Sequence, residues 1–160
     1  TWKTLDRGTE RGVCAVCLGA TDEAVEATLA QDYFAANLKR NDQALQESAA
    51  AFFKYFSDSP FDLKLPVDVQ ATAFQWRVWN RIKDIPYGQT RSYHKIASDL
   101  GKPGAVRAVA RACATNPVAL IIPCHRVIGS DGELHGYRWG LRRKQALLIH
   151  EKMNGRNEQA

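Results

Sequence analysis

The sequence predicts an α+β protein with two lobes: a small sheet-and-helix lobe over residues 1–70 and a mostly helical lobe over residues 71–160. Short apolar runs typical of strands occur in the first part, whereas apolar residues recur at helical spacing from residue 72 onward. The charge changes near the same place, from a net −3 over residues 1–66 to a net +8 over residues 67–160. With 160 residues, of which 45% are hydrophobic, the chain is long enough to bury a core.

Two segments of the first lobe are expected to be strands. GVCAVCLG at residues 12–19 is an apolar run between glycines, and FDLKLPVDV at residues 61–69 alternates strictly between apolar and polar residues. Pro66 lacks an N–H donor, which favours an edge position for the second strand. Two helical patterns lie between the strands. Their inward residues are Val25, Leu29 and Tyr33 in a helix from about Asp22, and Leu45, Ala49, Phe52 and Phe56 in the next helix.

Cys14 and Cys17 have the C-x-x-C spacing of zinc ligands, but no second pair of Cys or His follows nearby to complete four ligands. Buried core cysteines are therefore the favoured interpretation, and a metal or redox site is the alternative. We expect neither a metal nor a cofactor. The four cysteines of the chain lack the paired spacing of a disulfide framework, so a reducing cytoplasm is the expected location.

No apolar stretch approaches the roughly 20 residues needed to cross a bilayer, and no signal peptide is evident, so we expect no membrane association. The chain begins with Thr1 rather than Met, as a processed product or a fragment of a longer protein would.

The second lobe opens with a helix. Thr72 followed by Gln75 has the spacing of a capping box, and Pro86-Tyr87-Gly88 ends the pattern. The inward stripe of this helix is Phe74, Val78, Ile82 and Ile85. Trp76 and Trp79 are interpreted as packing residues rather than as a platform on which bases stack.

A helix-turn-helix outline follows, with SYHKIASDL, the turn GKPG and AVRAVARACA in succession. In the second helix Val106, Val109 and Cys113 share the expected core side. Arg107 and Arg111 point away from it, with Ala108 between them, so the helix backbone could approach a groove closely. Together with the positive charge, this face favours a nucleic-acid partner. A solvated basic face, with alanines present only for helix propensity, is the alternative.

The segment LIIPCHRVIGSDG at residues 120–132 places Cys124 and His125 side by side after an apolar run and a proline. A single cysteine is usually a small buried hydrophobe. Here the flanking basic residues can favour a thiolate. In the last helix Glu151 lies on the same face as Leu147 and Leu148, and a buried carboxylate needs a partner. Glu-His-Cys would supply an orienting acid, a base and a nucleophile. A Glu paired instead with Arg or Lys is the alternative.

These residues resemble a known family. NPVALIIPCHRVIG and GYRWGLRRKQALLIHE, with FQWRVWNRIKDIPYGQTRSYHKIA and GKPGAVRAVARACATNP upstream, are similar to the O6-alkylguanine-DNA alkyltransferases, also called methylated-DNA–protein-cysteine methyltransferases. The resemblance covers nearly the whole chain, more faintly through ERGVCAVCLG, and the GYRW stretch makes it most similar to the C-terminal domain of bacterial Ada. It implies a ribonuclease-H-like form for the first lobe and a winged-helix-like second lobe.

The resemblance also implies a role for each matching residue. Cys124 is the alkyl acceptor, His125 accepts the thiol proton through a water molecule, and Glu151 orients His125. Tyr93 assists the departing guanine and helps to rotate its phosphate, and Asn116 braces the turn before the active-site segment. Arg107 enters the base stack where the flipped nucleotide was. The implied DNA-binding set is Tyr93, Ala105, Arg107, Ala108 and Arg111, and the implied substrate pocket is Val127, Tyr137, Arg138 and Trp139.

The function implied is that of a suicide DNA repair protein. It flips O6-methylguanine, and O4-methylthymine, out of double-stranded DNA through the minor groove and transfers the methyl group irreversibly to Cys124. The protein is expected to act as a monomer. The alternatives are a catalytically silent DNA-binding damage flag or transcription regulator, and a Cys-His hydrolase that turns over. Trp139 has its own alternative, namely that it packs inward and never meets the substrate.

Overall fold

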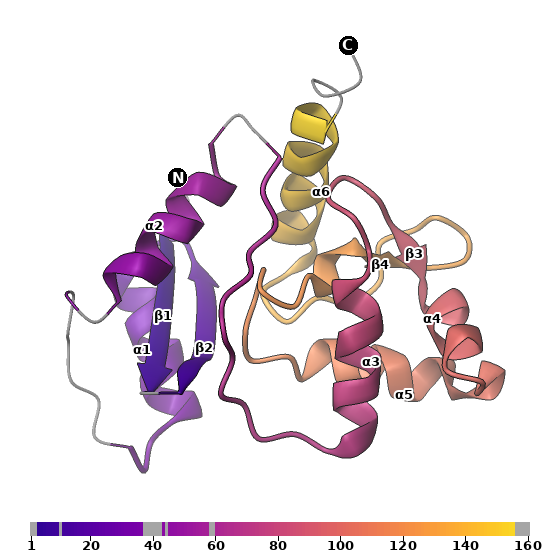
Figure 1. Cartoon of the computed structure of the whole chain (residues 1–160), viewed down its shortest axis with the longest axis horizontal. Helices are drawn as coiled ribbons and strands as arrows, with labels where there is room; N and C mark the ends of the chain where they lie inside the picture. Colours follow the sequence, from indigo (N-terminus) through magenta and orange to yellow (C-terminus); the bar gives the residue numbers. More distant parts are fainter. Residues whose placement is uncertain (1–2, 10, 37–42, 44, 58–59, 156–160) are drawn as a thin grey trace.

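The computed structural model describes residues 3–9, 11–36, 43, 45–57 and 60–155. It is a mixed helical and small-sheet structure, in which β1, β2, α1 and α2 lie on one side and α3, α4 and α5 on the other, with α6 between their upper ends (Figure 1). The α+β prediction is confirmed. The ribonuclease-H-like form stays a prediction, because the described part of the first lobe holds a two-stranded sheet.

The strands β1 (Lys3–Thr9) and β2 (Gly12–Gly19) form an antiparallel pair. The prediction of a strand at residues 12–19 is confirmed, and its side chains from Ala15 onward are buried. Helix α1 (Asp22–Asp32) packs on this pair through Val25 and Leu29, and the Thr21 hydroxyl caps its first turn by accepting from the Ala24 N–H. β1 was not predicted, because KTLDRGT is largely polar and shows no apolar period.

Helix α2 (Gln46–Tyr55) was predicted with Ala49 and Phe56 facing inward, and both details are wrong, since Ala49 is exposed as well. Phe52 and Tyr55 are buried, whereas Phe56 lies just after the helix and is 37% exposed. The two buried residues, Phe52 and Tyr55, are three positions apart, whereas the predicted pair, Phe52 and Phe56, is four apart. At this end of the helix the buried face therefore follows an i, i+3 spacing.

The expected strand at residues 61–69 is an extended segment with one isolated bridge, from Val67 to Val13 of β2. Its alternation is nevertheless present, since Leu63 is buried while Asp62, Lys64 and Pro66 are exposed. The bridge consists of two hydrogen bonds: the Val13 N–H donates to the Pro66 carbonyl at 2.8 Å, and the Asp68 N–H donates to the Val13 carbonyl at 2.9 Å. Pro66 has no N–H of its own to donate to a further strand.

Helix α3 (Ala73–Lys83) begins with the predicted capping box: the Gln75 N–H donates to the Thr72 hydroxyl, and the Thr72 N–H donates to the Gln75 side chain. Trp79 is buried, as a packing residue should be, and its indole N–H donates to the Ala112 carbonyl at 2.9 Å. That bond attaches α3 to α5.

The helix-turn-helix is present as α4 (Tyr93–Asp99), the 3-10 turn η1 (Pro103–Ala105) and α5 (Val106–Ala114). Ser92 caps α4 by accepting from the Lys95 N–H. A short parallel pair, β3 (Arg91–Ser92) with β4 (Val127–Ile128), brings the start of α4 beside the segment that follows Cys124.

One continuous core joins the two sides of the molecule, since Val13, Val16, Phe52 and Tyr55 belong to the same buried cluster as the inner faces of α3, α4 and α5. The edge of β2 also bonds directly to the chain before Cys124: the Val16 N–H donates to the Pro117 carbonyl at 2.9 Å, and the Val16 carbonyl accepts from the Ala119 N–H at 3.3 Å. Among the described residues, no helix is long and apolar enough to span a membrane.

Candidate active site

Cys124 opens a short 3-10 turn, η2 (Cys124–Arg126), directly after Pro123. Its backbone N–H donates to the Ile122 carbonyl at 2.8 Å, and its side chain is only 2% exposed. Burial raises the pKa of the Cys124 thiol well above the ordinary value, and the neighbouring Cys113 thiol raises it further. The flanking basic residues were expected to favour a thiolate. That expectation is wrong for the resting thiol, because desolvation outweighs the opposing effects of Asn116 and Lys144.

Asn116 ties the thiol to the turn that precedes it. Its Nδ2 donates to the Ile122 carbonyl at 2.9 Å and to Cys124 Sγ at 3.3 Å, while its Oδ1 accepts from the Val118 N–H at 3.0 Å. The turn needs such support, since Leu120 has a positive φ of 68°, a conformation that costs free energy for a residue with a Cβ. Asn116 therefore connects the end of α5 to the reactive sulfur.

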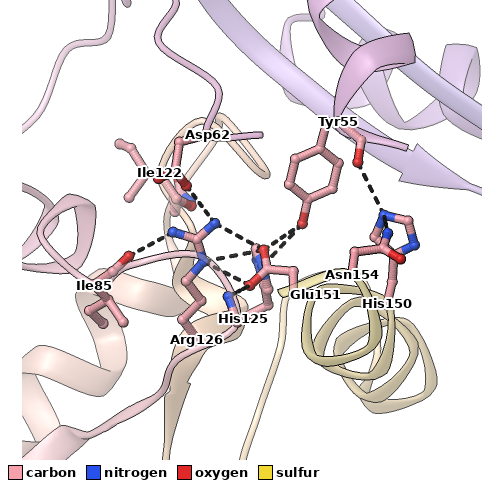
Figure 2. A network of polar contacts seen from close by, with 11 residues as sticks. Tyr55, Asp62, Ile85, Ile122, His125, Arg126, His150, Glu151 and Asn154 are labelled. Atoms are coloured by element: carbon pink, nitrogen blue, oxygen red, sulfur yellow. Dashed lines mark hydrogen bonds and ion pairs between the residues drawn. The ribbon is translucent and has the colours of Figure 1, made fainter. Parts of the chain in front are cut away.

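His125 and Glu151 form a buried pair. His125 Nε2 lies 2.8 Å from Glu151 Oε1 (Figure 2), and because an ionised carboxylate can only accept, Nε2 is the donor. Both residues are 0% exposed. Glu151 comes from α6 (Leu141–Gly155), whose face of Leu147 and Glu151 was predicted to be buried. His125 Nδ1 is also buried and has no hydrogen-bond partner among the described residues. Because Nε2 carries the proton that Glu151 accepts, Nδ1 presents a lone pair that can accept another proton.

Glu151 also pairs with an arginine, so both of its predicted pairings occur together. Arg126 Nε lies 2.9 Å from Glu151 Oε2, and Arg126 Nη2 lies 3.0 Å from Oε1 (Figure 2). The same guanidinium donates to the Ile85 carbonyl and to Asp62. Arg126 was not predicted as a site residue, although its place directly after Cys-His, in a buried segment, was a signal that a charged partner lies close by.

The turn after α3 supplies another donor. The Gly88 N–H donates to Glu151 Oε2 at 3.1 Å, and Gly88 has a positive φ of 73°. A Cβ at this position would lie 3.1 Å from the Glu151 carbonyl oxygen, so glycine allows this close approach.

These contacts determine the charge states of Cys124, His125 and Glu151, which we call the relay. Hydrogen bonds and charge from His125 and Arg126 hold the pKa of Glu151 well below its usual range despite burial. Burial lowers the pKa of His125, and the opposing attraction of Glu151 does not overcome it. The resting centre is thus a neutral thiol and a neutral imidazole beside an ionised carboxylate.

Tyr93 begins α4 and faces the same region. Its hydroxyl donates to the His135 carbonyl at 3.2 Å and accepts from Lys144 Nζ at 3.3 Å. Lys144 is completely buried and also donates to the His135 carbonyl at 2.8 Å, and burial lowers its pKa to about 8. Sequence reasoning missed Lys144, because a lysine in RRK at the start of a helix is indistinguishable from a solvated one.

A cavity of about 860 Å³ lies between α5 and the loop over residues 129–138. Its lining residues are Tyr93, Val106, Arg107, Ala110, Arg111, Ala114, Gly129, Ser130, Asp131, His135, Gly136, Tyr137 and Arg138. Arg107 and Arg111 are exposed here, as expected. Ala108 is exposed on α5 and Ala105 half-buried in η1, but neither belongs to the lining.

The four residues assigned to the substrate pocket divide into two pairs. Tyr137 and Arg138 line the cavity, whereas Val127 and Trp139 do not. Val127 is buried in β4, and Trp139, at 7% exposure, belongs to the core and packs edge-on against Tyr137. This position matches the alternative in which Trp139 packs inward. Arg138 forms an ion pair with Asp32 at the end of α1, so the first lobe holds this loop.

The cysteines of the C-x-x-C pattern lie away from this site. Cys17 is buried beside Val25 and Leu29, and burial raises its pKa to about 11, while the Cys14 carbonyl accepts from the Tyr33 hydroxyl. Their place in β2 fits the favoured interpretation as core cysteines.

Comparison with known proteins relates this geometry to one family. The model of the family described as "6-O-methylguanine DNA methyltransferase, DNA binding domain" matches residues 73–153. The bifunctional transcriptional activator/DNA repair enzyme Ada of Escherichia coli is 46% identical over 145 residues, which make up 91% of this chain and 41% of that protein. The methylated-DNA–protein-cysteine methyltransferase of Mycolicibacterium paratuberculosis is 45% identical over 112 residues, covering 70% of this chain and 68% of the relative. The chain thus spans about two fifths of the length of the Ada relative.

Among solved structures, Mycobacterium tuberculosis OGT in complex with DNA superposes with a TM-score of 0.75 at 31% identity, covering 96% of this chain and 93% of that one.

Proposed function

The chain belongs to the 6-O-methylguanine DNA methyltransferase family, and from this premise we propose that it repairs alkylated DNA by moving one alkyl group from a base to Cys124. The substrates proposed are O6-methylguanine and O4-methylthymine in double-stranded DNA. Methylated-DNA–protein-cysteine methyltransferase is the name given to several relatives at about half identity.

The observation that carries the proposal is the buried Cys124 thiol, bonded to Asn116 and followed by the His125–Glu151 pair. A thiol that is neutral at rest must lose its proton as it attacks, and His125 Nδ1 has the free lone pair to accept it, directly or through one water molecule. Glu151 then stabilises the imidazolium. No other ionisation is needed before the attack.

The proposed step is an in-line displacement at carbon. The Cys124 sulfur forms a bond to the methyl carbon, the bond from that carbon to guanine O6 breaks, and its electron pair stays with the guanine. The thiol proton goes to His125, and the departing guanine is stabilised by the Tyr93 hydroxyl, which burial keeps protonated by raising its pKa. Removing the methyl group would require the cysteine thiolate to leave from the carbon of a stable thioether, so the protein acts once.

The base must reach the thiol from outside the duplex, so the proposal includes base flipping. The cavity beside α5 supports it, since Arg107 and Arg111 border the opening and the small side chains Ala110 and Ala114 let the helix approach closely. We propose entry through the minor groove, with Arg107 occupying the gap in the stack. Monomeric action, a cytoplasmic location and lobes at residues 1–70 and 71–160 complete the proposal.

The test uses duplex DNA with a single O6-methylguanine and peptide mass spectrometry. We expect the Cys124 peptide to gain the mass of one CH2, and Cys124→Ser to gain none, because an alcohol is a far poorer nucleophile than a thiol paired with a base. DNA affinity of the Ser variant should stay nearly unchanged, since Arg107 and Arg111 are on the exposed face of α5 whereas Cys124 is buried. The matched control is Cys14→Ser, which changes a cysteine of β2, and its Cys124 peptide should still be methylated. Methylation of the Ser variant at this peptide would refute the assignment of the acceptor.

A further inference from the structure

Tyr55 brings a hydroxyl from the end of α2 into the relay, and neither the sequence interpretation nor the proposed step uses it. The hydroxyl donates to Glu151 Oε1 at 2.6 Å, and the side chain is 1% exposed. The two residues stand 96 positions apart in the chain, and Figure 2 shows the phenol of Tyr55 reaching the same carboxylate oxygen as His125.

The position of Tyr55 is held on several sides. Its backbone carbonyl accepts from His150 Nε2 at 3.1 Å (Figure 2). Its ring packs edge-on against Phe56 and Tyr87. Asn154, one turn after His150, donates to the Ser57 carbonyl at 3.3 Å. The end of α2 is thus attached to α6 next to Glu151, so the hydroxyl has little freedom to turn elsewhere.

The geometry bears on which nitrogen of His125 carries the proton. Glu151 Oε1 accepts from both Tyr55 and His125 Nε2, and the Tyr55 oxygen lies 3.4 Å from Nε2. Since the Tyr55 proton points to the carboxylate, the phenol oxygen turns a lone pair toward Nε2. A deprotonated Nε2 would face two oxygen lone pairs, so the tautomer with a proton on Nε2 is favoured.

We propose that Tyr55 is a positioning residue of the reactive centre, whose hydroxyl holds the Glu151 carboxylate and keeps His125 in the tautomer that leaves Nδ1 open to the thiol proton. This inference rests on the proposed function for its purpose. Through Tyr55 the first lobe acts on the chemistry without touching the substrate.

The hydroxyl also moderates the charge of Glu151. Tyr55 remains protonated, because burial and the carboxylate raise its pKa well above the ordinary value. The hydrogen bond from Tyr55 therefore partly neutralises the negative charge on Glu151 Oε1. Without that bond, the carboxylate would attract the His125 imidazolium more strongly. The titratable and charged groups that surround His125 and Glu151 are Tyr55 on α2, Asp62, Tyr87, Cys113 on α5, Cys124, Arg126, Tyr137, and Lys144 and His150 on α6.

Tyr55→Phe removes the hydroxyl and keeps the ring contacts. With more charge left on Oε1, the imidazolium gains stability and the thiol should lose its proton to His125 more readily. The pH profile of Cys124 methylation should then shift toward lower pH by about one unit, the scale of a lost hydrogen bond to a charged group. The maximal rate should fall several-fold, since the tautomer is less firmly held.

The experiment treats the full chain with methyl iodide, which is small enough to reach a buried thiol, and follows S-methylation of the Cys124 peptide against pH. Tyr33→Phe is the matched control, because it removes another hydroxyl of the first lobe, bonded to the Cys14 carbonyl, and should leave the profile unchanged. Thermal unfolding of each variant confirms that the fold is retained.

A double variant separates this role from general loosening. Glu151→Gln removes the carboxylate charge on which Tyr55 acts. Adding Tyr55→Phe to Glu151→Gln should therefore shift the pH profile of Cys124 methylation no further. An unchanged profile for Tyr55→Phe alone, or equal shifts in both backgrounds, would overturn the proposal. Methyl iodide needs no DNA, so a wild-type protein that failed to repair methylated DNA would refute the proposed function while this profile still tested Tyr55.

Discussion

The Cys124 thiol and the His125 imidazole are both buried, and burial disfavours the charged form of each. Glu151 is ionised among donors from His125, Arg126, Gly88 and Tyr55. Its charge is thus largely balanced before any reaction begins. In the proposed step the carboxylate favours the imidazolium that forms when the thiol proton moves, and this difference between the two states would assist the attack.

Replacing Glu151 by Gln tests that role. The imidazolium loses its stabilising charge, so the apparent pKa for Cys124 methylation should rise by about one unit or more. Rates of methyl iodide modification measured against pH would show the shift, opposite in sign to that of Tyr55→Phe. Because the groups titrate together, the value belongs to the network rather than to Cys124 alone.

The matched control is Glu133→Gln, which changes an exposed carboxylate on the loop and should leave the profile in place. If Glu151→Gln also left it in place, the carboxylate would have no part in moving the proton.

At the scale of elements, the site depends on how α5 and the loop over residues 129–138 face each other across the cavity. α5 is fixed from behind by Trp79 of α3 and continues through Asn116 into the turn before Cys124. Three elements hold the loop: Tyr93 of α4 and Lys144 of α6 bond to the His135 carbonyl, and Asp32 of α1 pairs with Arg138. The cavity walls are therefore tied to both lobes.

Arg107→Ala tests the face of α5. We expect repair in duplex DNA to slow by about tenfold or more, because a side chain that fills the gap of a flipped base offsets an unstacking cost of a few kcal/mol. Reaction with free O6-methylguanine base should change much less, since no stack is opened. Single-turnover rates on both substrates measure the difference.

Arg11→Ala is the control, as it removes an exposed positive charge from the turn between β1 and β2, away from α5. Equal losses on duplex and free base for Arg107→Ala would mean that this arginine acts on the chemistry or on the fold.

Across the whole molecule, local patterns were predictable and long-range contacts were not. The strand at residues 12–19, the capping box at Thr72 and the buried face of Glu151 follow from spacing alone. Tyr55 could not be foreseen, because its contact with Glu151 depends on how α2 docks against α6. The expected thiolate was wrong for a related reason: the charges near Cys124 are visible in the sequence, but the depth of burial that opposes them is not.

The central claim is that Cys124 accepts one alkyl group and acts once. The most direct measurement incubates the full chain with an excess of duplex DNA carrying a single O6-methylguanine, and follows both the intact protein mass and the repaired base over time. We expect one CH2 gained per protein molecule, with an equal amount of guanine restored and no further reaction. Binding without any mass gain would indicate a damage flag, and repair continuing beyond one base per protein molecule would indicate a turnover enzyme; either result would refute single-use transfer to Cys124.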